Sequence, residues 1–196
     1  KKKREAEISG QIKEIRTKFG RKTDLGVRRT EIGEAPKEMV VPLDILIERE
    51  PITVICSQKG WIRGAKGHLT ETADLKYKDG DGQRFVFHAQ TTDKILMFAT
   101  NGRFYTLFGD KLPGGRGHGD PVRLMVDLPN DQDILALFVH SPGQKIVVAS
   151  SDGRGFIARE EELIAQTKNG KQVLNIETGK EAQACAPVTG DMIAVV

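Results

Sequence analysis

The sequence contains few of the residues that build disulfide frameworks, metal sites or membrane spans. Its two cysteines, Cys56 and Cys185, form no Cys-x-x-Cys pair and have no histidine at ligand spacing, so neither a disulfide framework nor a zinc site is expected. We interpret both as buried thiols in a reducing cytosol. No run of about 20 apolar residues is present, and the charged residues 1–5 lead into no apolar signal core. These absences argue against membrane spanning and secretion.

A catalytic constellation is also missing. The four histidines have no partnered serine or cysteine at a recognisable elbow, and no carboxylates cluster at metal-ligand spacing. Aromatic residues make up only 6% of the chain. The phenylalanines in strand patterns are expected in the core rather than in base stacking: Phe98, Phe104, Phe108, Phe138 and Phe156. For Trp61, which follows a turn, blade packing is favoured over ligand contact. We therefore expect no catalytic residue, metal or cofactor in this chain.

Net charge is small, but the two signs are concentrated in different segments. The formal net charge is +3 over 196 residues. Residues 1–30 carry +7, residues 31–58 carry −4, residues 59–123 carry +4 and residues 124–196 carry −4. Two basic segments are therefore present, and the local field, rather than the total charge, determines whether a polyanion binds.

The first basic segment predicts an amphipathic helix over residues 3–19. Ile8, Ile12, Ile15 and Phe19 recur at helical spacing, and Gly20 follows them. Lysines and arginines occupy much of the opposite face, where a solvated surface is favoured over direct nucleic-acid contact. Glycine and prolines then predict a linker that reaches about residue 48.

From about residue 50 the sequence changes to short strands rich in β-branched residues, each closed by a glycine turn. Three copies place four apolar or small residues before two polar ones and an X-Gly turn: residues 51–60, 94–102 and 145–153. A second strand is expected after each turn, at residues 61–63, 103–108 and 154–158. A fourth copy begins at residues 191–196. Asn101-Gly102 and Asp152-Gly153 are dipeptides typical of type I′ hairpins, in which both central residues have positive φ.

This repeat predicts an all-β fold, a β-propeller with one blade per unit of about 40–50 residues. Three blades and a start are too few for closure, since propellers usually have about four to eight blades. We therefore expect a partial propeller over residues 49–196, in a fragment or a piece of a longer chain. A β-sandwich is the alternative, but it gives no reason for the same hairpin to recur at this spacing.

Three motifs, in order along the chain, resemble the A subunits of bacterial type II topoisomerases. Phe19-Gly20 with residues 28–32 (RRTEI) is similar to the segment at the end of the DNA-cleaving core. Residues 60–68 (GWIRGAKGH) and 112–121 (LPGGRGHGDP) are similar to a first-blade hairpin and a glycine-rich segment of the topoisomerase IV branch. The basic glycine-rich box of the gyrase branch is only partly matched, which favours topoisomerase IV and argues against strong DNA wrapping.

The resemblance implies that residues 1–48 are the end of the core and a linker, and that residues 49–196 are a DNA-binding propeller without catalytic residues. It implies an ATP-dependent holoenzyme that contains a second A subunit together with the B subunit, in which ATP and Mg²⁺ bind elsewhere. The implied role is to bind and bend duplex DNA and so guide relaxation and decatenation. The implied location is the bacterial cytoplasm, at the nucleoid or peripherally at the membrane. The alternatives are a gyrase A propeller that wraps DNA and a propeller that binds proteins.

Basic residues near the hairpin turns are the candidates for phosphate contact. In residues 111–119, glycines let backbone N–H groups and Arg116 approach a phosphate without obstruction by Cβ atoms. Repeated on successive blades, such groups would form a basic stripe along the propeller rim. Phosphate contacts do not read bases, so binding should depend on salt more than on sequence. The predicted DNA-binding residues are Lys59, Arg63, Lys66, Arg103, Lys111, Gly114, Gly115, Arg116, Gly117, Arg154, Lys168 and Lys171.

Overall fold

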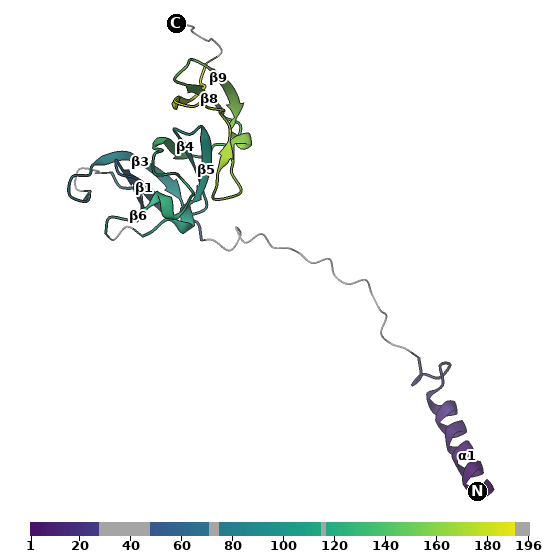
Figure 1. Ribbon diagram of the computed structural model, residues 1–196. Helices are drawn as coiled ribbons and strands as arrows, with labels where there is room; N and C mark the ends of the chain where they lie inside the picture. Colours follow the sequence, from purple (N-terminus) through teal and green to yellow (C-terminus); the bar gives the residue numbers. More distant parts are fainter. Residues whose placement is uncertain (28–47, 71–74, 115–116, 191–196) are drawn as a thin grey trace. The chain divides into compact units, whose positions relative to one another are not determined.

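Helix α1 (Lys2–Phe19) lies in the first of two units of the chain, which comprise residues 1–41 and 42–196 in this computed structural model (Figure 1). The structure describes residues 1–27, 48–70, 75–114 and 117–190.

Helix α1 confirms the predicted amphipathic helix and ends before Gly20. Its four apolar side chains from Ile8 to Phe19 are 52 to 60% exposed, so this face has no cover among the described residues. The motif at residues 28–32, the glycine and prolines of the linker and the fourth repeat at residues 191–196 lie outside the described residues.

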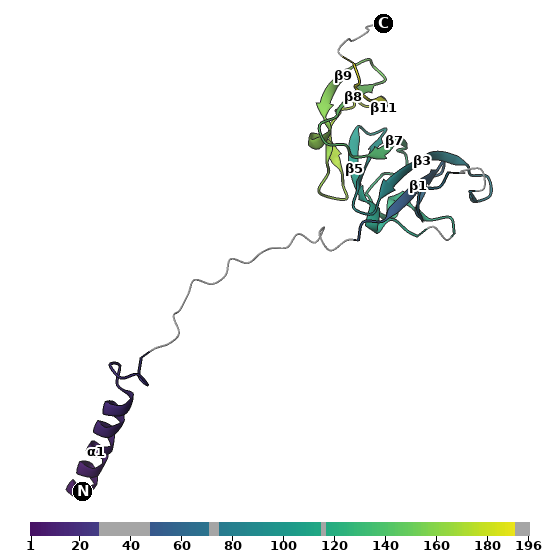
Figure 2. The ribbon, with the colours of Figure 1, turned by 180° about the vertical axis from the view of Figure 1, so that it is seen from behind.

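The second unit confirms the all-β propeller prediction with three antiparallel sheets, one for each repeat (Figures 1 and 2). Blade 1 has the strand order β3 (Gln83–Gln90), β1 (Pro51–Ser57), β2 (Trp61–Lys66) and β6 (Asp120–Pro121). Blade 2 has the order β10 (Lys171–Gln172), β5 (Arg103–Phe108), β4 (Lys94–Ala99) and β7 (Ile134–Val139). Blade 3 has the order β11 (Ala182–Pro187), β8 (Lys145–Ser150) and β9 (Gly155–Arg159). Short 3-10 helices η2 (Gly109–Lys111), η3 (Val122–Leu124) and η4 (Glu160–Leu163) lie between strands.

Blades 1 and 2 each take an edge strand from the repeat that follows in the sequence. Strand β6 comes after the β4–β5 hairpin but pairs with β2 of blade 1, with Trp61 opposite Pro121. Strand β10 comes after the β8–β9 hairpin but pairs with β5 of blade 2, with Phe104 opposite Lys171. An exposed edge strand presents unpaired N–H and C=O groups, and the donated strands satisfy part of that edge. Neighbouring blades are therefore interlocked, and a sequence repeat is not identical to a blade.

The hairpin turns differ from the predicted type I′ turns. Gly60, Gly102 and Gly153 have φ values of 77, 74 and 81°, but no other residue type in the described ranges has positive φ. The type I′ prediction was therefore wrong, since it requires positive φ at Asn101 and Asp152 as well. The first two hairpins use three-residue loops in which the last residue alone is left-handed.

The blade 2 turn shows how its side chains make this loop possible. The Gly102 amide donates to the Ala99 carbonyl at 3.0 Å. The Arg103 amide donates to Asn101 Oδ1, also at 3.0 Å, so the Asn101 side chain stabilises the turn without a left-handed Asn101 backbone.

The core lies between the blades, and β4 contributes to it from both faces. Ile95 and Met97 pack with blade 1 residues such as Val54 and Ile62. Leu96 and Phe98 pack on the other side with blade 3 residues such as Ile146 and Val148. This alternation follows from the two-residue period of a strand, and it makes β4 a continuous buried run.

The predicted core phenylalanines divide into two groups. Phe98 and Phe104 are fully buried and stack with a centroid distance of 4.5 Å, and Phe138 is half-buried against the same cluster. Phe108 and Phe156 are 37% and 44% exposed, so the core prediction was wrong for them. Phe108 is the last residue of β5, and Phe156 lies on β9, the edge strand of blade 3.

The two cysteines lie in different environments. Cys56 is fully buried, and burial raises the pKa of its thiol to about 12. Cys185 is half-buried; burial, followed by the nearby charge of Glu160, raises its pKa to about 12. Both are free thiols, and the prediction that they are buried is confirmed for Cys56 only.

Two turn glycines provide a matched test of this fold. A Cβ atom on Gly102 would lie 2.1 Å from the Leu174 carbonyl oxygen, whereas a Cβ on Gly153 would meet nothing within 4 Å. Gly153→Ala should lower the free energy of unfolding by about 1 kcal/mol, because the left-handed backbone alone is strained. Gly102→Ala should lower it by about 3 kcal/mol or more, because overpacking adds to that strain. Urea unfolding of both variants measures the difference, and equal losses would contradict the packing of Gly102 against Leu174.

Candidate nucleic-acid interface

Arg63 of β2 joins two loops on one side of blade 1. It is only 6% exposed. Its Nη1 donates to the Gly117 carbonyl, and its Nη2 donates to the Lys76 carbonyl at 3.1 Å. A buried guanidinium is costly unless its N–H groups find acceptors, and its rigid, planar set of donors can bridge two carbonyls at once. Arg63, which we predicted to contact DNA, is therefore committed to holding these loops.

The first of these loops contains the glycine-rich segment and lies against β2. Gly64 N donates to the Pro113 carbonyl at 2.9 Å, and a β-bridge joins Gly64 to Gly114. Gly119 has a φ of 81°, and a Cβ there would lie 2.2 Å from the Ile62 carbonyl oxygen. Only glycine permits this approach. The predicted site residues Gly115 and Arg116 lie outside the described residues, between the fixed Gly114 and Gly117.

The second loop, residues 75–82, brings two exposed lysines to the same strand. Lys76 is held through its carbonyl by Arg63, and Lys78 Nζ lies 3.2 Å from the centroid of the half-buried Trp61 ring. An ammonium group at this distance gains a cation–π interaction with the indole. Our sequence reasoning missed Lys76 and Lys78 as site candidates. The sequence does contain two lysines close together, in Lys76-Tyr77-Lys78. The position of Lys78 beside Trp61, however, depends on the path of the loop in the fold.

Lys59 lies in the turn before β2 and Lys66 is the last residue of β2, and both have acidic neighbours. The Lys59 amide donates to Asp81 Oδ1 at 3.0 Å, and Lys59 Nζ contacts the Asp79 carbonyl at 3.5 Å. Burial opposes ionisation of Asp81, but hydrogen bonds from Ser57 and backbone amides outweigh it and hold the pKa of Asp81 below its usual value. Lys66 pairs with Glu50 at 3.0 Å and is 82% exposed, so this ion pair adds little to stability.

The remaining predicted residues lie in other environments. Arg103 Nη1 donates to the Asn169 carbonyl at 2.9 Å, and Lys171 Nζ donates to the Glu162 carbonyl. Arg154 lies between Glu177 and Asp152, at 2.5 and 3.3 Å. Lys111 and Lys168 line a cavity beside β5.

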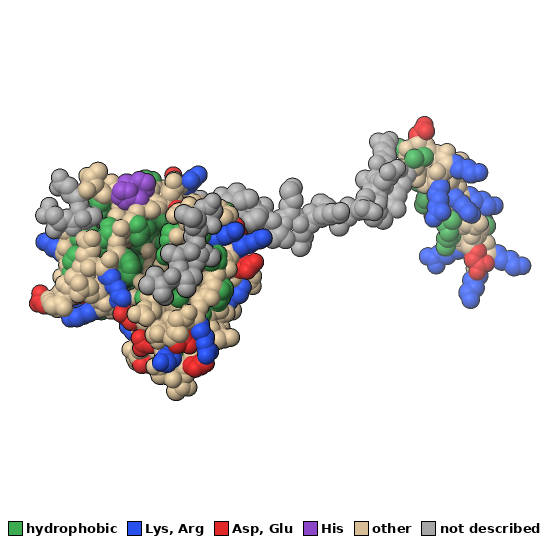
Figure 3. All heavy atoms as spheres, turned by 90° about the horizontal axis from the view of Figure 1, so that it is seen from above, with side chains coloured by type: hydrophobic (Ala, Val, Ile, Leu, Met, Phe, Trp, Pro, Cys, Tyr) green, Lys and Arg blue, Asp and Glu red, His purple; other side chains and the backbone are tan. Residues whose placement is uncertain are grey.

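Basic side chains do not form an unbroken stripe on the face that Figure 3 shows, where blue and red side chains of the second unit are interspersed. Arg154 is the clearest case, because its two carboxylate neighbours leave little free positive charge for a phosphate. Among the described residues, the arrangement of blade 1 around Arg63 is therefore the strongest candidate for an interface.

No group of three or more histidine, cysteine or acidic side chains in the described ranges is arranged to hold a metal ion. Glu160, the first of three consecutive glutamates, is only 1% exposed. Glu160 Oε1 accepts hydrogen bonds from His140 Nδ1 at 2.8 Å and from the Ser141 amide at 2.6 Å. These contacts tie η4 to the end of β7 and explain the burial of this carboxylate.

Comparison with curated proteins identifies close relatives of the chain. It is 44% identical over 190 residues to the A subunit of DNA topoisomerase 4 from Rickettsia conorii, a match that covers 96% of this chain. The corresponding protein of Caulobacter vibrioides is 43% identical over 97% of this chain. The chain is a relative of the topoisomerase IV A subunits. It spans about a quarter of the length of these relatives.

The similarity extends to solved structures of topoisomerase IV domains. The Escherichia coli ParC C-terminal domain has a TM-score of 0.67 and 28% identity, covering 72% of this chain and 58% of that one. A C-terminal domain of DNA topoisomerase IV has a TM-score of 0.65 at 15% identity, covering 74% and 47%, and supports the fold alone. The first of these structures agrees with the resemblance inferred from the motifs. A comparison with protein-family models finds no match. In the described residues, no helix is long and apolar enough to cross a bilayer.

Replacing Arg63 tests its role in positioning the two loops. Arg63→Gln should lower the free energy of unfolding by about 2 kcal/mol, because at least one of the two carbonyls that accept from Arg63 loses a charged donor. Amide hydrogen exchange should become faster at Gly64 and Val122, whose amides bond to Pro113 and Gly60. Lys66→Gln is the matched control on the same strand, and its effect should stay below about 0.5 kcal/mol. Unchanged exchange in Arg63→Gln would show that Arg63 does not fix the glycine-rich loop.

Proposed function

We propose that residues 49–196 bind and bend duplex DNA as the C-terminal propeller of one of the topoisomerase IV A subunits, and that residues 1–48 are the end of the core and a linker. The observation that carries this proposal is that the buried Arg63 joins the loop of the exposed Lys76 and Lys78 to the glycine-rich loop, in a chain related to the topoisomerase IV A subunits. In the holoenzyme, which would contain a second A subunit together with the B subunit, this propeller would guide ATP-dependent relaxation and decatenation.

The chemistry of blade 1 suits phosphate binding. Lys76 and Lys78 are exposed, and Arg63 holds their loop beside the loop that carries Arg116. Fixed loops lose little conformational entropy on binding, so the positive charges act with a smaller ordering cost. Backbone N–H groups near Gly114 and Gly117 can approach a phosphate closely because no Cβ obstructs them: a Cβ at either position would meet nothing within 4 Å.

The charge distribution favours modest binding over extensive wrapping. Asp79 and Asp81 accompany Lys59, and two carboxylates accompany Arg154 of blade 3. These acidic groups restrict positive potential to part of the rim. A gyrase-like propeller that wraps DNA is therefore the less favoured candidate. A propeller that binds only proteins is the other alternative, and it predicts no salt-dependent DNA affinity.

Titration of the chain with labelled duplex DNA at several salt concentrations tests the proposal. With about three phosphate contacts, a fourfold rise in salt should weaken binding about forty-fold, because bound counterions are released. Duplexes of unrelated sequence should bind alike, since phosphates carry no base information. Exchanging Lys76 and Lys78 together for Gln should lower affinity and reduce the slope of log affinity against log salt by about 2.

The matched control exchanges two exposed lysines of the acidic region, Lys145 and Lys180, for Gln. This variant has the same change in net charge, so a specific role of blade 1 predicts a much smaller change in the slope. Equal effects of the two variants would contradict the blade 1 interface, and absence of binding at low salt would contradict DNA binding altogether.

A further inference from the structure

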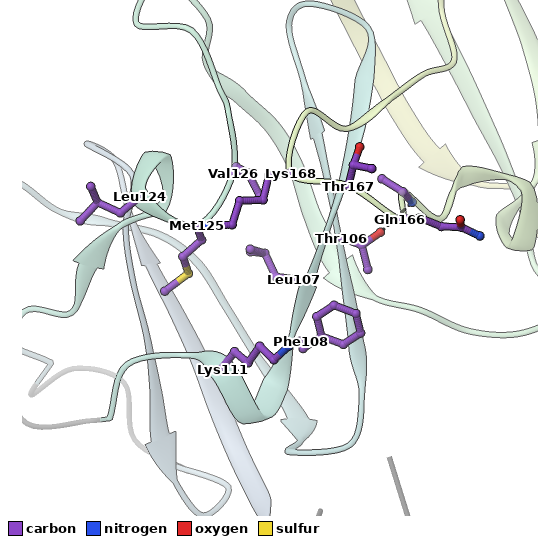
Figure 4. Close-up of a pocket in the computed structure, with 11 residues that line it drawn as sticks. Thr106, Leu107, Phe108, Lys111, Leu124, Met125, Val126, Gln166, Thr167 and Lys168 are labelled. Atoms are coloured by element: carbon purple, nitrogen blue, oxygen red, sulfur yellow. Dashed lines mark hydrogen bonds between the residues drawn. The ribbon is translucent and has the colours of Figure 1, made fainter. Parts of the chain in front are cut away.

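A cavity of about 380 Å³ lies beside the end of β5 and does not belong to the blade 1 interface. Three segments form its walls: the end of β5 with Lys111, residues 124–126, and residues 165–168 (Figure 4). Two hydrogen bonds hold these walls together. The Asp127 amide donates to the Lys168 carbonyl at 2.9 Å, and the Ala165 amide donates to Thr106 Oγ1, also at 2.9 Å. The cavity is thus fixed by contacts between segments that lie far apart in the sequence.

Two of the apolar side chains that line this cavity are exposed to solvent. Leu107 and Val126 are buried beneath it, whereas Leu124 is 71% exposed and Phe108 is 37% exposed. Figure 4 shows Leu124 and Met125 on one side of the cavity, and Thr106, Gln166 and Thr167 on the other. In the described part of the second unit, four large hydrophobic side chains are exposed, and two of them line this one cavity. Exposed apolar side chains that gather around a hollow are typical of a binding site.

The charged groups of the cavity are both positive. Lys111 and Lys168 line it, and no aspartate or glutamate does. Lys111 Nζ lies 5.0 Å from the centroid of the Phe108 ring, so its charge is held beside the apolar surface. Asp110 and Asp127 are the sequence neighbours of lining residues, but neither lines the cavity. A ligand that combines an apolar group with nearby negative charge would be complementary to this arrangement.

We propose that this cavity binds an acidic segment of a partner protein, which inserts one bulky apolar side chain and places carboxylates near Lys111 and Lys168. The volume is at the small end of ligand sites, enough for one large side chain. It is too small to admit a duplex, and a phosphate gains nothing from Leu124 and Met125. Lys111 and Lys168, which we predicted to bind DNA, thus acquire a different role. This inference is independent of DNA binding by blade 1.

Fluorescence anisotropy with short labelled peptides tests this site. The probe has Leu or Phe at its centre, with Asp and Glu on both sides. Matched peptides have Ala at the centre, or Asn and Gln in place of the acidic residues. The apolar, acidic probe should bind saturably, and each matched peptide should bind at least about tenfold more weakly, because each lacks one part of the complementarity.

Two surface variants locate the binding. Leu124→Ser should lower the affinity for the probe at least about tenfold. Ile157→Ser, which removes an exposed apolar side chain from β9, should leave this affinity unchanged. Circular dichroism verifies that both variants fold. Leu124→Ser should retain DNA affinity, which separates this site from the blade 1 interface. The proposal is overturned if the probe does not bind or if Leu124→Ser binds it with unchanged affinity. It is also overturned if Leu124→Ser lowers the affinities for DNA and for the probe equally.

Discussion

The donation of an edge strand by each following repeat is the constraint on which the rest of the propeller depends. Strand β6 covers part of the β2 edge of blade 1, and β10 covers part of the β5 edge of blade 2. Each donated strand is only two residues long, so its position depends on the segment before it. For β6 that segment is the glycine-rich loop, and for β10 it is residues 165–170. Both candidate sites lie where these segments cross to the preceding blade.

The crossing of the glycine-rich loop explains why a buried arginine is needed in blade 1. The loop has backbone carbonyls that face the blade, and its glycines provide no apolar side chains to pack there. Arg63 supplies donors to Gly117 and, at the same time, to Lys76 of the other loop. A single buried cation thereby joins two loops, one of which carries the exposed Lys76 and Lys78. The second crossing produces a different chemistry, because residues 165–168 meet Leu124 and Met125 and enclose an apolar cavity.

The strands and the helix could be predicted from the sequence because the spacing of apolar residues differs between strands and helices and follows which face is apolar. The run from Ile95 to Ala99 is buried on both faces, and the spacing of Ile8 to Phe19 is helical. The donated strands could not be predicted, since two residues carry no period. Asn101-Gly102 suggested a type I′ turn, but the Asn101 side chain satisfies the Arg103 amide in a longer loop. For Arg63 the sequence indicates a positive charge, but only the fold shows that carbonyls surround it. Lys76 and Lys78 gain importance from the same long-range contact.

The central claim is that strand donation and Arg63 gather DNA-binding charges on blade 1. Lysine acetylation of the chain with and without duplex DNA, mapped by mass spectrometry, tests this claim most directly, because every exposed lysine reports on its own surroundings. At low salt, DNA should protect Lys76 and Lys78 strongly and Lys59 partly, while Lys145 and Lys180 of the acidic region react as in the free chain. Protection confined to Lys145, Lys168 and Lys180 would contradict the account. So would acetylation that, at every lysine, is the same with and without DNA.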